Sequence, residues 1–207
     1  MNINKALENY INTEILPQYK KNDIGHSLEH IDYVVRRCFG FSEQFPDIDI
    51  NMLYTIAVFH DIAHHIDKKN HEKLSAEIFY NNEKIQNFFT DKERALIKEA
   101  IEDHRASSGS APRSDYGKII SSADRSTDVD DFLRRTHAYT LKHYPDCTRV
   151  EMLQRAYEHT EQKYGKDGYA KHYVKDEEYE NFRNEINLLL QDWEKFKNRY
   201  YFANNIL

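Results

Sequence analysis

The length, composition and charge of the chain limit its class before any motif is considered. Its 207 residues can bury a sizeable core, and only 6 Gly and 4 Pro leave few residues for the tight turns of a large β-sheet. The formal net charge of −6 argues against a nucleic-acid polymer as the main partner, because contact with a phosphate backbone requires a strongly basic surface. We therefore expect an all-α protein.

Apolar residues recur at helical spacing along most of the chain. Pro17 is expected to end the first helix, and the segment SSGSAPRSD, residues 107–115, is the most loop-like stretch. TDKE at 90–93 fits a capping box, which marks the start of a helix. The predicted helices lie at about 7–17, 27–45, from 51 to the motif at 60, 71–88 with a turn, 90–106, 117–125, 129–144, 148–164 and 176–201.

We divide the chain into a helical domain over residues 1–145 and a C-terminal helical extension over 146–207 that packs on it. Pro145 separates the helix before it from two longer, more charged helices. Aromatic residues in the extension are interpreted as groups that pack it onto the helical domain, rather than as a platform for base stacking. The connecting stretch YGKDGYAKHY, residues 164–173, also suits a lid over a phosphorylated substrate, because it combines glycines, lysines and aromatic residues.

Neither the cysteines nor the hydropathy pattern indicates a secreted or membrane protein. Cys38 and Cys147 lie far apart without CxxC spacing, so they predict neither a zinc ribbon nor a disulfide framework. No apolar run approaches the roughly 20 residues that span a bilayer, and the start MNINKALENYI lacks the apolar core of a signal peptide. These features predict a cytoplasmic protein without a membrane partner. They leave open whether it forms a homodimer.

The stretch AVFHDIAHHID, residues 57–67, places ionisable side chains directly behind an apolar run. Each would cost several kcal/mol if it were buried unpaired, so partners are required. His60 and His64 flank Asp61 as in the HExxH pattern of zinc peptidases, but aspartate is one methylene shorter than the glutamate of that pattern. The other interpretation is that His60 and Asp61 bind an ion together with side chains from other helices.

Two further helices offer isolated candidates of the required types. His30 lies in an apolar helical stripe, and Asp124 follows the apolar KIISSA. Taken singly, each could be a hydrogen-bonded or ion-paired structural residue. In the order EHIDYV, AVFHDIAHH, EDHRAS and ISSADR, however, the chain resembles the HD-domain superfamily of metal-dependent phosphohydrolases over roughly residues 25–145. The resemblance implies an all-α fold and the metal ligands His30, His60, Asp61 and Asp124.

The resemblance also implies the chemistry. Two imidazoles and two carboxylates suit a divalent ion of Mn, Fe, Co, Ni, Zn or Mg, and the sequence does not choose among them. The expected partner is a small phosphorylated substrate, nucleotides first, hydrolysed by an activated water, with Asp61 or Asp124 as catalytic proton acceptor. Two alternatives remain open: a two-iron oxygenase, and a non-catalytic binding or sensing module whose metal site is structural.

A second group of residues surrounds these candidates. We expect four of them to bind substrate phosphate: His71, His104, Arg105 and Arg125. The two histidines could instead bind a second ion, and the two arginines could instead pair with Asp103 and Asp128. Three other histidines are expected to orient the ligating imidazoles: His26, His64 and His65.

Overall fold

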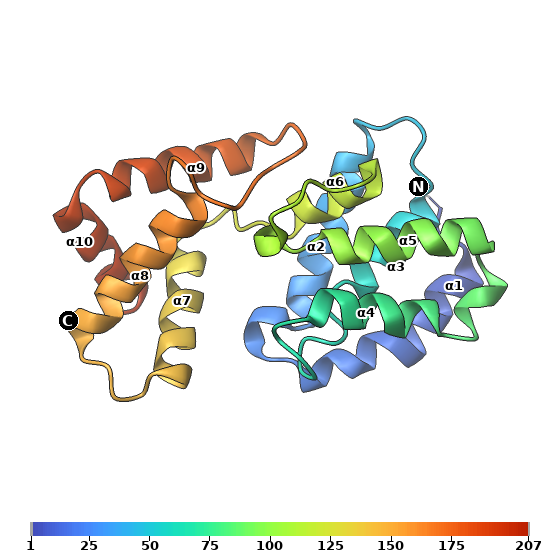
Figure 1. The fold of residues 1–207 in the computed structure, drawn as a ribbon, viewed down its shortest axis with the longest axis horizontal. Coiled ribbons are helices and arrows are strands. Elements are labelled where there is room, and N and C mark those ends of the chain that lie inside the picture. Colours follow the sequence, from blue (N-terminus) through green and yellow to red (C-terminus); the bar gives the residue numbers. More distant parts are fainter. Residues whose placement is uncertain (1, 207) are drawn as a thin grey trace. The chain divides into compact units, whose positions relative to one another are not determined.

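The computed structural model describes residues 2–206, and in that range the chain forms ten α-helices and no β-strand (Figure 1). The expected all-α class is thereby confirmed. The helices are α1 (Lys5–Tyr10), α2 (Leu28–Ser42), α3 (Ile50–Phe59), α4 (His71–Tyr80), α5 (Asp91–Asp103), α6 (Asp115–Ala123), α7 (Val129–His143), α8 (Arg149–Tyr164), α9 (Glu177–Leu190) and α10 (Trp193–Ala203). No helix within residues 2–206 is both long enough and apolar enough to cross a bilayer.

The helices group into two compact units. The first comprises residues 2–124 and His172–Lys175, and the second comprises residues 125–171 and 176–206. The change between units falls directly after Asp124 rather than near residue 145, because α7 packs with α8, α9 and α10. Packing of the C-terminal residues onto the first 145 stays a prediction.

Helix α3 occupies the centre of the first unit because it is apolar on all sides. Residues 52–59 are all buried, and α2, α5 and α6 pack around the helix. Asp49 begins it: Asp49 Oδ1 accepts hydrogen bonds from the backbone N–H groups of Asn51 and Met52 at 2.8 and 3.0 Å. The helix ends at His60, so the polar stretch that follows it starts in the interior of the unit.

Capping residues set several helix boundaries as the sequence predicts. Thr90 Oγ1 accepts from the N–H of Glu93 at 3.4 Å, and Glu93 Oε2 accepts from the N–H of Thr90 at 2.8 Å, which is the expected capping box of α5. Thr148 and Glu151 form the same box at the start of α8. Both helices therefore begin where their side chains satisfy the first free N–H groups.

The predicted end of the first helix at Pro17 was wrong. Helical turns continue after α1 as a π-helix over Ile11–Ile15 and a 3-10 helix over Leu16–Lys21. Pro17 lies in the first turn of the 3-10 helix, where its missing N–H is not needed for a helical hydrogen bond.

The single helix predicted over 176–201 is in fact two. Asp192 has an extended backbone, and its Oδ1 accepts from the N–H of Lys195 at 3.1 Å. Asp192 is thus the N-cap of α10, and α9 ends before it, at Leu190.

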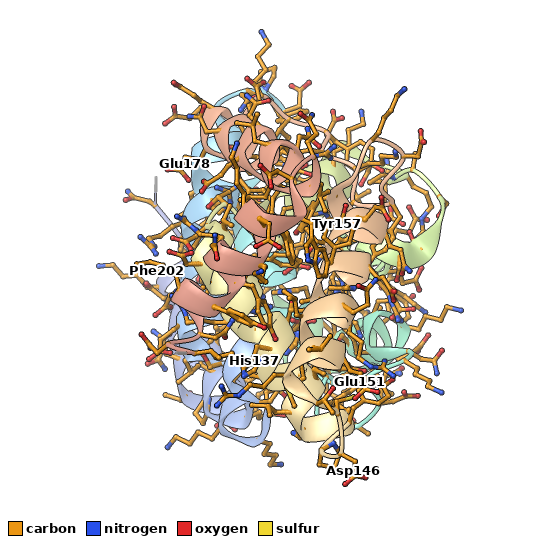
Figure 2. The ribbon with its side chains drawn as sticks, turned by 90° about the vertical axis from the view of Figure 1, so that its left-hand side faces the viewer. His137, Asp146, Glu151, Tyr157, Glu178 and Phe202 are labelled. Atoms are coloured by element: carbon orange, nitrogen blue, oxygen red, sulfur yellow. The ribbon has the colours of Figure 1, made fainter. Side chains whose placement is uncertain are left out.

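Aromatic side chains form the core of the second unit. The rings of Phe132, Tyr164 and Phe182 meet edge to face, with centroids 5.1, 6.3 and 4.9 Å apart. Tyr157 of α8, which Figure 2 shows among the side chains of this unit, packs edge to face on Phe196 at 5.1 Å. These contacts lie within the second unit, and packing of the extension's aromatic residues onto the first 145 residues stays a prediction.

Four residues from the connection between α8 and α9 belong to the first unit. The Gln44 amide donates to the carbonyl of Lys175 at 2.9 Å and accepts from its N–H at 3.0 Å. The N–H of Tyr173 donates to Ser122 Oγ at 2.9 Å. These hydrogen bonds between side chains and backbone attach His172–Lys175 to the turn after α2 and to α6. The lid function of this stretch stays a prediction.

Leu53→Ala should lower the free energy of unfolding by about 2 to 5 kcal/mol, because it leaves a cavity at the centre of α3. The Leu53 side chain is 0% exposed, whereas Leu28 at the start of α2 is 37% exposed. Leu28→Ala, the matched control, should cost less than about 1 kcal/mol. Urea unfolding followed by circular dichroism measures both, and equal losses would contradict a central position for α3.

Candidate metal centre

The four residues expected as metal ligands come together in the first unit. His30 lies on α2, His60 and Asp61 follow α3, and Asp124 follows α6. His30 Nε2 is 3.2 Å from Asp124 Oδ1 and 3.7 Å from Asp61 Oδ2. His60 Nε2 is 3.4 Å from Asp61 Oδ2 and 3.9 Å from Asp124 Oδ1. Three stretches far apart in the sequence thus present two nitrogens and two oxygens to one point.

The spacing of these atoms fits one divalent ion. Donor atoms bound to an ion at about 2.1 Å lie about 3.0 to 3.4 Å apart in octahedral or tetrahedral geometry, close to the observed 3.2 to 3.9 Å. Within residues 2–206, Nε2 of His30 and Nε2 of His60 are buried and have no hydrogen-bond partner. Buried nitrogens without partners are costly, and an ion would satisfy both.

The other oxygen of Asp61 faces a second pair of histidines. Nε2 of His71 and Nε2 of His104 lie 3.3 and 3.4 Å from Asp61 Oδ1 and 3.1 Å from each other. Their Nδ1 atoms lie 3.1 and 2.6 Å from the carbonyls of Lys68 and Ile101. Since Nδ1–H donates there, the lone pair of each ring, when the ring is in its neutral form, lies on Nε2. Two lone pairs and a carboxylate oxygen face one another, an arrangement that a cation stabilises.

Three helix C-termini meet at this centre. His60, His104 and Asp124 are the residues directly after α3, α5 and α6. Helix C-termini carry partial negative charge, which favours cations and adds to the carboxylate charges. His60 Nδ1 donates to the carbonyl of Ala57 at 2.8 Å, so its Nε2 is directed at the carboxylates. The local field and the orientation of the rings both suit a bound cation.

The carboxylates also control the protonation of the histidines. Burial lowers the pKa of His60, but attraction to Asp61 and Asp124 outweighs burial and raises this pKa to about 9. Burial lowers the pKa of His30 and that of His71. Burial would raise the pKa of Asp61, but the positive charge of His60 holds it well below its usual range. Without an ion at pH 7, His60 is charged and His30 and His71 are neutral.

A family model described as HD domain matches residues 24–127, half of the chain. The chain belongs to the HD-domain family. The matched region contains His30, His60, Asp61 and Asp124, and the family indicates metal-dependent, hydrolase-type activity with divalent ions. Comparisons with curated proteins and with solved structures gave no significant match.

The arginines expected to bind phosphate already have protein partners. NH1 of Arg105 donates to Glu72 Oε2 at 2.9 Å, so in the described part of the chain this guanidinium pairs with Glu72 rather than with Asp103. Arg125 is buried in the second unit, where its Nε donates to the carbonyl of Lys171 at 3.3 Å. Their substrate-binding roles stay predictions.

We call the group formed by His30, His60, Asp61 and Asp124 the HD centre. Two of the three supporting histidines lie beside it, together with an aspartate that the sequence analysis missed. Asp23 Oδ1 accepts from His26 Nδ1 at 2.6 Å, and the rings of His26 and His64 stack with centroids 3.4 Å apart. His64 groups with these two residues among the described ones, so no HExxH-type pair forms. His65 is exposed, with Nδ1 3.0 Å from Asn22 Oδ1. The i, i+3 spacing of Asp23 and His26 was a signal that could have found this aspartate.

Binding of Mn²⁺ at the HD centre should release about one proton from His60 near pH 7, because a charged imidazole must lose its proton to become a ligand. The apparent affinity should rise with pH until the pKa of about 9 is passed. Calorimetric titrations in buffers of different ionisation enthalpy count the protons. His143→Ala, which changes an exposed histidine of the second unit, should release the same number. Binding without proton release would contradict the charged state of His60.

Proposed function

We propose that the protein is a metal-dependent phosphohydrolase that acts on a small phosphorylated metabolite, with nucleotides as the first candidates. One observation carries the proposal: the Asp61 carboxylate is divided between two histidine pairs. Its Oδ2 faces His30 and His60 at 3.7 and 3.4 Å, and its Oδ1 faces His71 and His104 at 3.3 and 3.4 Å. A bridging carboxylate of this kind suits two neighbouring ions, which hydrolases use to hold the attacking and leaving oxygens of a phosphoryl group.

We infer that His71 and His104 hold the second ion, in place of the substrate phosphate that the sequence analysis assigned to them. Their Nε2 lone pairs face each other at 3.1 Å, which a phosphate oxygen, itself an acceptor, would not relieve. When bound, the ions polarise a phosphoryl oxygen and lower the pKa of a water molecule towards about 7.

The carboxylates of Asp61 and Asp124 have different roles in the proposed reaction. Asp61 uses both oxygens towards the histidines, and its side chain is 3% exposed. The Asp124 side chain is 22% exposed and approaches His30 and His60 through Oδ1. We therefore assign proton acceptance from the attacking water to Asp124 and the bridging position to Asp61.

Two other functions use the same donor atoms. A two-iron oxygenase would show redox-active paired iron and consumption of oxygen, and a non-catalytic module would hold metal tightly without turnover. Metal analysis of the purified protein, followed by a screen of phosphorylated metabolites, separates the three. Phosphate release that depends on Mn²⁺, Co²⁺ or Fe²⁺ supports the phosphohydrolase, and its absence across all tested ions rejects it.

Asp61→Asn should reduce phosphate release by orders of magnitude and weaken binding of both ions, because the amide keeps the shape but removes the bridging charge. Turnover per folded molecule and metal content by mass spectrometry measure the two effects. The melting temperature serves as the control for folding. A variant that unfolds readily yet hydrolyses substrate at the wild-type rate per folded molecule would show that the ions are structural.

His104→Ala should lower the ion stoichiometry from about two to about one and reduce kcat in parallel. If His104 served only substrate phosphate, the stoichiometry would stay the same and mainly KM would rise. His143→Ala is the matched control, because His143 is an exposed histidine of the second unit. It should change neither quantity.

A further inference from the structure

A hydrogen-bonded aspartate–histidine pair lies beside the proposed ion positions and has no role in the function described so far. Asp23 Oδ1 accepts from His26 Nδ1 at 2.6 Å, and Asp23 Oδ2 accepts from Lys68 Nζ at 3.0 Å. These two contacts hold the pKa of the Asp23 carboxyl well below its usual range, the bond from His26 having the larger effect. The carboxylate is therefore charged and fixed at both oxygens.

This contact determines what the other nitrogen of His26 can do. Because Nδ1–H is donated to Asp23, the neutral ring carries its lone pair on Nε2. His26 Nε2 lies 4.0 Å from Asp61 Oδ2, the same oxygen that His30 and His60 approach at 3.7 and 3.4 Å. A separation of 4.0 Å is too long for a direct hydrogen bond, so the Nε2 lone pair is left for a water molecule that lies beside this oxygen.

The surrounding side chains keep His26 in this orientation. The ring of His64 stacks on it with centroids 3.4 Å apart and planes 20° apart. The Asn22 amide donates to the carbonyls of His26 and Asp61 at 3.2 and 3.0 Å, and Asn22 Oδ1 accepts from the N–H of His65 at 3.1 Å. Asn22 thus ties the turn that bears His26 to the turn that bears Asp61.

The same cluster is poorly suited to a further cation, although Asp23, His26 and His64 offer three donor atoms within 4.8 Å of one another. Imidazole lone pairs lie in the ring plane, so two rings stacked 20° from parallel cannot both direct a lone pair at one ion. The ammonium of Lys68 also lies on Asp23. The geometry instead suits His26 to orient a molecule that donates a hydrogen bond to its Nε2.

We propose that His26 is a catalytic residue that accepts a hydrogen bond from the attacking water, with Asp23 as its positioning residue. The inference rests on the proposed hydrolysis at the HD centre. His26 Nε2 directs the water oxygen towards the phosphorus, and Asp23 keeps the lone pair on Nε2. The other proton of the water passes to Asp124, the acceptor assigned above, as the new P–O bond forms. The bond from phosphorus to the leaving-group oxygen breaks, and that oxygen keeps the electron pair and takes a proton from solvent.

Steady-state kinetics of His26→Ala provide the first test. Misplacing the water should lower kcat by roughly 100-fold while KM and the ion stoichiometry stay near their wild-type values. Free imidazole should restore part of the activity of His26→Ala, but none of that of His30→Ala, which loses a ligand. Asp23→Asn should lower kcat less than His26→Ala does, because the amide oxygen of Asn can still accept a hydrogen bond from His26 Nδ1. A fall in ion stoichiometry, or no rescue by imidazole, would overturn the proposal.

A second measurement does not depend on turnover. In Mn²⁺-loaded protein, ¹⁷O relaxation of water reports how long a water molecule stays at the ions, and the hydrogen bond to His26 should prolong that time. His26→Ala should shorten it severalfold, and His143→Ala should not. An unchanged residence time in His26→Ala would overturn the inference. If the wild-type protein hydrolyses no phosphorylated compound, the proposed function fails on its own, and the relaxation measurement still decides the role of His26.

Discussion

One buried carboxylate, that of Asp61, sets the arrangement of polar side chains in the first unit. Its side chain is 3% exposed, and a charge at such a position is costly unless other charges and donors surround it. Without an ion, the charged ring of His60 balances it, and the pKa of His60 rises to about 9 in consequence. Divalent ions would balance the same charge and displace that proton. Protonation of His60 and binding of divalent ions are therefore two alternative ways to balance the charge of Asp61.

The fold provides this centre mainly through helix ends. Helix α3 is buried on all sides, so His60 and Asp61 can enter the interior only where the helix stops. His104 and Asp124 occupy the same position after α5 and α6, and the negative ends of three helices meet. His71 is the first residue of α4, and burial, together with the nearby His104, lowers its pKa, so its imidazole is neutral at pH 7. Loops could not place these groups as reproducibly, because helix packing fixes their ends.

Motif order and apolar context were sufficient to predict that His30, His60, Asp61 and Asp124 lie together, because each of them stands in or directly behind an apolar helix. The approach of His71 to His104 at 3.1 Å was beyond prediction, since it depends on how α4 and α5 pack. Asp192 shows a different limit. In an exposed, charged stretch, an N-cap aspartate has no pattern that distinguishes it from a residue in the middle of a helix, and one predicted helix became two.

The donor set also explains why the four expected metal ligands alone do not choose between hydrolysis and oxygen chemistry. Imidazoles and carboxylates accept manganese, iron, cobalt, nickel, zinc and magnesium with different affinities, so the ion decides which electrons are available. In the proposed mechanism, the chain instead controls the position of the attacking water. Asp23, His64 and Asn22 fix the His26 ring from its edge, its face and its backbone, although none of them is assigned to an ion. So many constraints on one imidazole are useful if a water must approach phosphorus from a single direction, as in-line hydrolysis requires. They are less useful to an oxygenase, whose oxidant binds at the metal, and this asymmetry favours the phosphohydrolase.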